Sequence, residues 1–145
     1  MSDVTTTIAA LREAMRNFVD ERDWSQFHSP KNLAMSLAIE AAEVMEHFQW
    51  VDVAESRSRG HDPRHREAIG EELADVCCYL LSLANSLDID LSDAVRDKLA
   101  KNALKYPATQ FRGRFERSED SRAQVQTPQG NPSPGTELDG CQTHS

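Results

Sequence analysis

Residues 36–48 read SLAIEAAEVMEHF, and residues 67–87 read EAIGEELADVCCYLLSLANSL. Apolar residues recur in both stretches every three or four positions, which is the spacing of one face of an α-helix. The two apolar stripes consist of Leu33, Leu37, Ala41, Val44 and Phe48 around the first stretch, and of Ile69, Leu73, Val76, Leu80, Leu83 and Leu87 in the second. The pattern predicts two helices that pack against each other through these stripes.

Pairs of acidic residues border both stripes. Glu40 and Glu43 flank the first stripe, and Glu72 and Asp75 flank the second. If the stripes pack together, the four carboxylates converge, and their mutual repulsion then requires cations or shared protons. Oxygen ligands in that number suit Mg²⁺, with Mn²⁺ as a second possibility. The alternative is that each pair is an ordinary solvated helix edge.

A di-iron centre is the rival metal chemistry for a helical bundle, and it requires Glu-x-x-His on two helices. Neither stretch has that motif, because the third residue after Glu43 is Glu46 and the third after Glu72 is Asp75. The ligand set is therefore oxygen-only. Such a set favours a redox-inert cation that binds and polarises substrate phosphates.

The rest of the chain predicts two more helices and a tail. The expected helices cover about residues 5–23, 30–51, 67–87 and 90–106, with a solvent-exposed connection over 56–65. Beyond residue 115 the apolar periodicity is lost and prolines and glycines accumulate. The sequence predicts an all-α four-helix bundle over residues 1–115 and a disordered tail over residues 116–145.

Composition narrows the class of protein. The chain has 145 residues, a hydrophobic content of 39% and a net charge of −8, which together indicate one acidic domain with a core. It lacks the basic block that would neutralise many phosphates, so we expect no nucleic-acid partner. It also lacks a membrane-length apolar run and a signal-like N-terminus, so we expect no membrane partner and a cytoplasmic location. Three cysteines indicate no disulfide framework.

Several aromatic and basic residues are candidates for a ligand pocket. Trp24, Phe27 and Trp50 are either pocket walls or core and interface anchors, and His28 is either a pocket residue or a surface group. Tyr79 lies one turn after Asp75, so it lines the core with its hydroxyl near a polar partner. The inward side of the last helix turns polar at Lys98, Asn102 and Lys105. These groups either face a cavity or complement the negative end of the helix.

A family resemblance over about residues 8–115 bears on all these candidates. The strings that carry it are Glu21-Arg-Asp-Trp24, Phe27-His28, Pro30-x-Asn32-Leu33, Glu40-x-x-Glu43, Phe48-Gln-Trp50, Glu71-Glu72-Leu-x-Asp75 and Lys105-Tyr106-Pro107. They resemble the all-α nucleoside triphosphate pyrophosphohydrolases of the MazG-like superfamily, and most of all the dCTP pyrophosphatase group. The carboxylate pairs are typical of the superfamily, whereas the aromatic strings are typical of the subgroup.

The resemblance implies a role for each matching residue. Mg²⁺ is held by the four carboxylates, among which we prefer Glu43 as the general base. The residues that would bind base and sugar are Trp24, Phe27, His28, Trp50 and Tyr79. Asn102 would donate a hydrogen bond to the nucleotide, and the phosphates would be bound by Lys98, Lys105 and Tyr106. One departure affects base preference: some relatives are expected to have His on the first helix, where this chain has Met15.

The resemblance also implies an activity and an assembly. We expect Mg²⁺-dependent hydrolysis of dCTP, or of a modified dCTP, to the monophosphate and pyrophosphate, which serves nucleotide-pool sanitation. We also expect a homotetramer built as a dimer of dimers, in which a neighbouring subunit completes the pocket. Two alternatives stay open: a related enzyme for dUTP or non-standard purine triphosphates, and a non-catalytic helical interaction protein.

Overall fold

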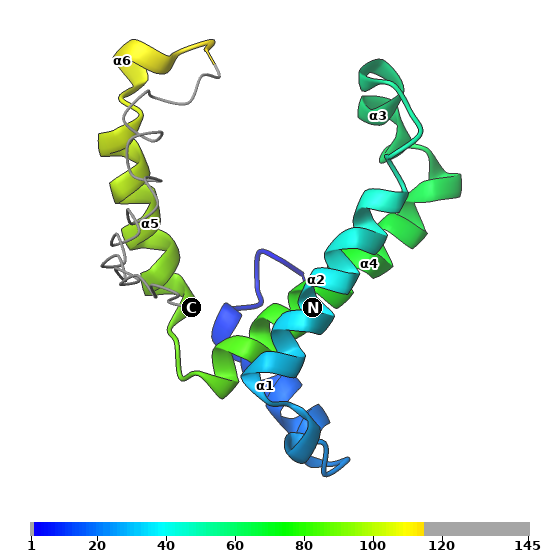
Figure 1. The fold of residues 1–145 in the computed structure, drawn as a ribbon, viewed down its shortest axis with the longest axis vertical. Coiled ribbons are helices and arrows are strands. Elements are labelled where there is room, and N and C mark those ends of the chain that lie inside the picture. The colour runs from blue at the N-terminus through cyan, green and yellow to red at the C-terminus, as the bar shows by residue number, and fades with distance from the viewer. Residues whose placement is uncertain (1, 115–145) are drawn as a thin grey trace, which may run out of the picture. The chain divides into compact units, whose positions relative to one another are not determined.

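The structure is a computed structural model that describes residues 2–114, and its regular elements there are all helical. In chain order the elements are α1 (Ile8–Asp20), the 3-10 helix η1 (Ser25–Phe27), α2 (Pro30–Glu46), α3 (Val53–Arg59), α4 (Pro63–Ser86), α5 (Leu91–Lys105) and α6 (Ala108–Phe111) (Figure 1). The predicted all-α class is confirmed. The four longest helices, α1, α2, α4 and α5, are those that the sequence predicts, and the predicted tail lies outside the described residues.

Local sequence explains where the main helices begin. The hydroxyl of Thr7 accepts a hydrogen bond from the Ala10 amide at the start of α1. The hydroxyl of Ser29 does the same for the Asn32 amide at the start of α2, where Pro30 occupies the first helical position. Each cap satisfies an amide that has no partner within its own helix. The helices that carry the carboxylates therefore have defined starting points.

The chain divides after Leu104 into two units. In the first unit, α2 lies alongside α4, and α1 packs on α4 as well (Figure 1). The buried apolar residues of this packing are Val19, Leu33, Ile69, Leu81 and Ala84. A polar clamp joins α1 to α4, since the Arg12 Nε donates to the Asn85 side-chain oxygen at 2.8 Å and the Asn85 amide donates to the Arg12 carbonyl at 3.0 Å.

The predicted stripe of α4 is wrong for three of its residues. Ile69 is buried, but Leu73, Leu80 and Leu87 are 54%, 40% and 48% exposed in this chain. The exposed leucines repeat every seven residues, so they form a second apolar seam on the side of α4 that α1 and α2 leave open. On α2, Ala41 is likewise exposed rather than part of the core.

Two boundaries and one connection also differ from the prediction. α1 ends at Asp20, because the chain then turns through Asp23, whose φ of 52° is in the left-handed region. α2 ends at Glu46 instead of continuing to residue 51. The predicted connection over 56–65 is wrong at both ends. Asp52 caps the short helix α3 by accepting a hydrogen bond from the Glu55 amide at 2.7 Å, and α4 begins at Pro63 instead of at the predicted residue 67.

The second unit is described from residue 105 to residue 114. In it, Tyr106 and Phe111 form an edge-to-face aromatic pair with ring centroids 5.3 Å apart, and the Lys105 ammonium lies 5.4 Å from the Tyr106 ring centre. Among the helices of the described chain, none is long and apolar enough to cross a membrane.

Candidate metal centre and adjoining cavities

Three of the four predicted carboxylates meet in space. Glu40 and Glu43 project from α2 and Glu72 projects from α4, and one carboxylate oxygen from each lies within 4.8 Å of the others. Glu40 and Glu72 are half-buried, whereas Glu43 is exposed. Asp75 is not part of this close trio, but its charge acts on both Glu40 and Glu72. The packing of α2 on α4 thus produces the convergence that the stripes predict.

The electrostatics of the cluster show how strongly the carboxylates interact. Partial burial raises the pKa of Glu40, and the charges of Glu43, Asp75 and Glu72 raise it further. Partial burial likewise raises the pKa of Glu72, with further contributions from Glu43 and Asp75, against an opposing effect of His47. Both groups resist ionisation, first because partial burial disfavours the charged form and second because neighbouring carboxylates repel it. A cation at this position would relieve that repulsion.

The donor set fits a hard divalent cation. All the close ligand atoms are carboxylate oxygens, which Mg²⁺ prefers. Two oxygens that share one Mg²⁺ lie at most about 4 Å apart, since each is about 2.1 Å from the ion. The 4.8 Å spread of the trio is within a small side-chain rotation of that arrangement. Glu40, Glu43 and Glu72 are therefore the residues that would hold the ion, with Asp75 beside them.

A cavity of about 290 Å³ has Asp75 in its lining, and we call it the aromatic cavity. It lies between α1, the loop around η1 and α4, and its lining residues are Met15, Phe18, Trp24, His28, Asp75, Cys78, Tyr79 and Ser82. Trp24 and Phe18 form its aromatic wall as an edge-to-face pair with centroids 5.8 Å apart. Asp75 lines this cavity, and its charge acts on Glu40 and Glu72, so the acidic cluster adjoins the aromatic cavity.

A second cavity of about 220 Å³ adjoins the first, and we call it the polar cavity. The two cavities share Met15, His28 and Ser82. Beyond these shared residues the polar cavity is lined by Arg16, Val19, Asp20, Ser25, Asn85 and Ser86. The aromatic cavity therefore has a neighbour whose lining offers hydroxyl, amide and charged groups.

The structure brings some of the predicted pocket residues to this site and leaves others away from it. Trp24, His28 and Tyr79 line the aromatic cavity. Phe27 and Trp50 line neither cavity and are 59% and 89% exposed.

The predicted nucleotide and phosphate contacts are on later parts of the chain. Lys98 and Asn102 are on α5, and neither lines a cavity described above. Lys105 and Tyr106 belong to the second unit of the chain. The phosphate contacts of these residues stay predictions.

Sequence reasoning missed several residues of the site. Phe18, Cys78 and Ser82 line the aromatic cavity without having been predicted there. Cys78 and Ser82 follow Asp75 by three and seven residues, which puts all three on one face of a helix. This spacing from the predicted site residue Asp75 could have identified them. His47, whose charge acts on Glu72, follows Glu43 by four residues and had the same signal.

Comparison with known proteins leads to the same family that the sequence motifs resemble. The MazG-like family model matches residues 35–120. The chain is 41% identical over 107 residues to dCTP pyrophosphatase 1 of Rattus norvegicus, and 43% identical over 102 residues to dCTP pyrophosphatase 1 of Homo sapiens. These alignments cover 74% and 70% of this chain, but 63% and 60% of the relatives, so the chain spans about three fifths of their length.

A solved structure shares the fold. The pyrophosphatase from Archaeoglobus fulgidus DSM 4304 is 37% identical, with a TM-score of 0.65 over 74% of this chain and 98% of that one. The fold and the site define a helical protein with a carboxylate centre beside an aromatic cavity. This chain belongs to the MazG-like family, as its sequence motifs predict.

Proposed function

We propose that this chain is a Mg²⁺-dependent pyrophosphohydrolase that converts dCTP, or dCTP modified on the base, to the monophosphate and pyrophosphate. The observation that carries the proposal is the junction at Asp75, where the acidic cluster meets the aromatic cavity. A nucleotide needs both features side by side, because its phosphates require cationic charge and its base requires an apolar, aromatic enclosure. The names of the relatives supply the substrate.

The reaction follows from the charges of the cluster. A water oxygen attacks the α-phosphorus, the bond to the bridging oxygen breaks, and pyrophosphate leaves. Glu43 takes the proton of that water, because it is the exposed member of the trio. Glu40 and Glu72, with Asp75 beside them, are the residues that would hold the ion, Mg²⁺ or Mn²⁺. When bound there, it would supply positive charge that stabilises the leaving pyrophosphate.

The cavities support assignments for the rest of the substrate. Trp24, Tyr79 and His28 enclose the base and sugar in the aromatic cavity. The adjoining polar cavity leaves room beyond the base, which is consistent with a modified cytosine. Phe27, Trp50, Lys98, Asn102, Lys105 and Tyr106 are proposed to bind substrate as the family resemblance implies.

Exposed apolar side chains support assembly into a homotetramer of two dimers. We also propose a cytoplasmic location for this assembly. Met35 and Ile39 on α2 are 58% and 56% exposed, and Leu73 and Leu80 expose the second seam of α4. Apolar residues in such number on adjacent helices are typical of a surface that another chain covers. In the assembly, residues such as Trp50 complete the site of a neighbouring subunit.

A substrate panel tests the proposed activity. The protein is incubated with Mg²⁺ and each natural or base-modified triphosphate, and the products are resolved by anion-exchange chromatography. We expect dCMP and pyrophosphate to form fastest from dCTP or its analogues, and no turnover in excess chelator. Release of orthophosphate, or full activity in chelator, would contradict the proposal.

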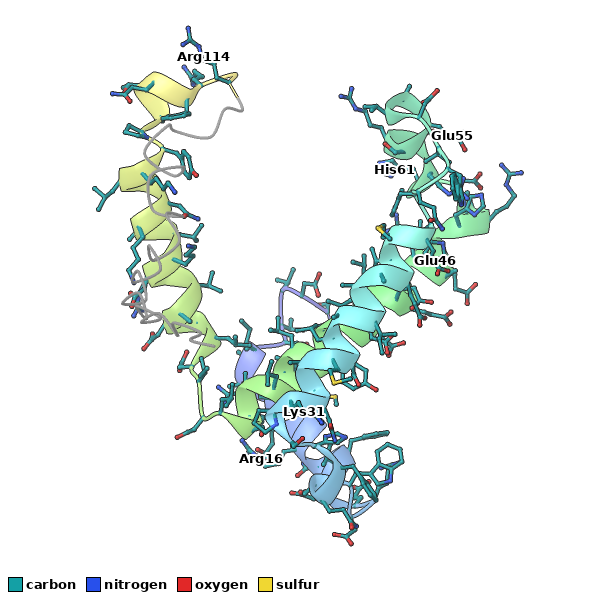
Figure 2. The ribbon with its side chains drawn as sticks, in the orientation of Figure 1. Arg16, Lys31, Glu46, Glu55, His61 and Arg114 are labelled. Atoms are coloured by element: carbon teal, nitrogen blue, oxygen red, sulfur yellow. The ribbon has the colours of Figure 1, made fainter. Side chains whose placement is uncertain are left out.

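A matched pair of variants ties the activity to the carboxylates. Glu43→Gln should lower turnover at least about a hundredfold, because it removes both a ligand and the proton acceptor. Glu46→Gln is the control, since Glu46 is a neighbouring exposed carboxylate at the C-terminal end of α2 outside the trio (Figure 2). Preference for dUTP or purine triphosphates would favour the related-enzyme alternative. Absence of turnover in the panel would favour an interaction protein.

A further inference from the structure

Ser82 is the one buried polar residue among residues 2–114. It lies on α4, has 6% of its surface exposed, and borders both the aromatic and the polar cavity. Its neighbours in the shared lining are Met15, which is apolar, and His28. A hydroxyl at this point is available to a ligand that occupies either cavity.

The hydroxyl of Ser82 forms no hydrogen bond with any part of the chain that the structure describes. Two serines that line the polar cavity are paired: Ser25 donates to the Asp20 carboxylate at 3.2 Å, and Ser86 donates to the His28 carbonyl at 3.5 Å. Among the described residues, the buried side-chain atom that lacks a partner is the Arg59 Nε, so the Ser82 hydroxyl oxygen is not sealed off and is reached from the cavities that it lines. A ligand in these cavities can therefore use its free hydrogen-bonding capacity.

The position of Ser82 relative to Asp75 identifies which part of a ligand it meets. The two residues are seven positions apart on one face of α4, which corresponds to about 10 Å along the helix axis. Tyr79 lies between them, and all three line the aromatic cavity. A nucleotide with its phosphates at the carboxylates and its ring beside Tyr79 directs the polar edge of its base towards Ser82.

We propose that the Ser82 hydroxyl forms a hydrogen bond with the nucleobase of the bound substrate and is a specificity-determining residue of this chain. This inference rests on the proposed function, because it requires the aromatic cavity to bind a nucleotide. A hydroxyl both donates and accepts, so it pairs with the ring nitrogen, the carbonyl or the amino group of cytosine. Met15 and Cys78 offer that edge no comparable partner.

The experiment compares Ser82→Ala with Ser36→Ala as a control. Ser36 is a half-buried serine on α2 that lines neither cavity. Binding of dCMP, which has the base but not the leaving pyrophosphate, is measured by calorimetry. The KM and kcat for dCTP and the melting temperature are measured on the same proteins.

We expect Ser82→Ala to weaken dCMP binding and to raise the KM by about fivefold, which is typical of one lost hydrogen bond. We expect kcat to stay near the wild-type value, since the hydroxyl is remote from the reacting phosphorus. The melting temperature should not fall, because no hydrogen bond of the folded chain is removed. The control should match the wild type in every measurement.

Each other outcome has a distinct meaning. If the wild type and Ser82→Ala bind dCMP equally tightly, the proposed role of Ser82 is overturned and the proposed function is left intact. A Ser82→Ala variant that loses stability and binding together would show a structural role instead. A wild-type protein that neither binds dCMP nor hydrolyses dCTP would refute the proposed function, and this inference with it.

Discussion

Replacing Trp24 by Ala separates a pocket wall from a core residue. The side chain is 43% exposed and packs edge-to-face on Phe18 at 5.8 Å. Truncation of a fully buried tryptophan costs about 3–5 kcal/mol, so this partly exposed ring with its aromatic contact should contribute about 2 kcal/mol. For a domain of this size the melting temperature should fall by about 10 °C.

The same change should act more strongly on substrate binding. Stacking of a base on an aromatic side chain contributes about 1–3 kcal/mol, so Trp24→Ala should raise the KM for dCTP about tenfold or more. Trp24→Phe keeps an aromatic face, so it should lower the melting temperature less and raise the KM less than Trp24→Ala does.

Fluorescence provides an independent readout of the same ring. The chain has two tryptophans, so Trp50→Ala leaves Trp24 as the only indole. Its emission should change when dCMP is added. An unchanged KM in folded Trp24→Ala, together with no emission change in Trp50→Ala, would refute the assignment of Trp24 to the nucleotide pocket.

The other predictions concern the cluster, a helix cap, the core and the assembly. The pKa of Glu40 is raised above 4.5 in the folded state, so in chelator its contribution to stability is lost as pH rises through that raised value. Glu40→Gln should therefore melt higher than the wild type at pH 7 without metal, and Mg²⁺ should stabilise only the wild type; the reverse order would contradict this. Hydrogen bonds from Arg64 lower the pKa of Asp62 to about 2, so this carboxylate stabilises the fold above about pH 4, and the benefit disappears as pH falls to about 2. When unfolding is measured over a range of acid pH, Asp62→Ala should be less stable than the wild type above that window, and the two proteins should be equally stable below it. Leu33 is 2% exposed, so Leu33→Ala should cost about 3 kcal/mol in urea unfolding, and a loss well below about 1 kcal/mol would contradict its central place in the core. Trp50→Ala should change monomer stability by less than about 0.5 kcal/mol, because the ring is 89% exposed, yet should raise the KM if a neighbouring subunit completes the site.

Periodicity predicted the existence of the helices better than it predicted their buried faces. α4 carries apolar residues on more than one side, and the sequence assigned Leu73 and Leu80 to the core together with Ile69. In the structure only Ile69 of these three is buried. Burial depends on which neighbour covers a face, and a pattern along one helix contains no information about that neighbour. The short helix α3 escaped prediction for a related reason, since its charged sequence has no apolar stripe.

The acidic cluster was more predictable than the cavity. Glu40, Glu43 and Glu72 converge because their spacing puts them beside the stripes, and the packing of α2 on α4 then fixes their separation. The aromatic cavity instead depends on how the loop around η1 closes against α1 and α4. Its inner residue Ser82 looked like an ordinary helical serine until burial and the two cavities identified it.

The same packing contact that stabilises the fold also determines the chemistry of the site. Burial of Leu33 and Ile69 holds α2 against α4. This contact keeps the carboxylates close to one another in spite of their mutual repulsion. Changes in the cavity, such as Met15 in place of the expected histidine, do not touch that contact. Substitutions at Met15 and Ser82 can therefore change the lining of the aromatic cavity while the acidic cluster stays as it is.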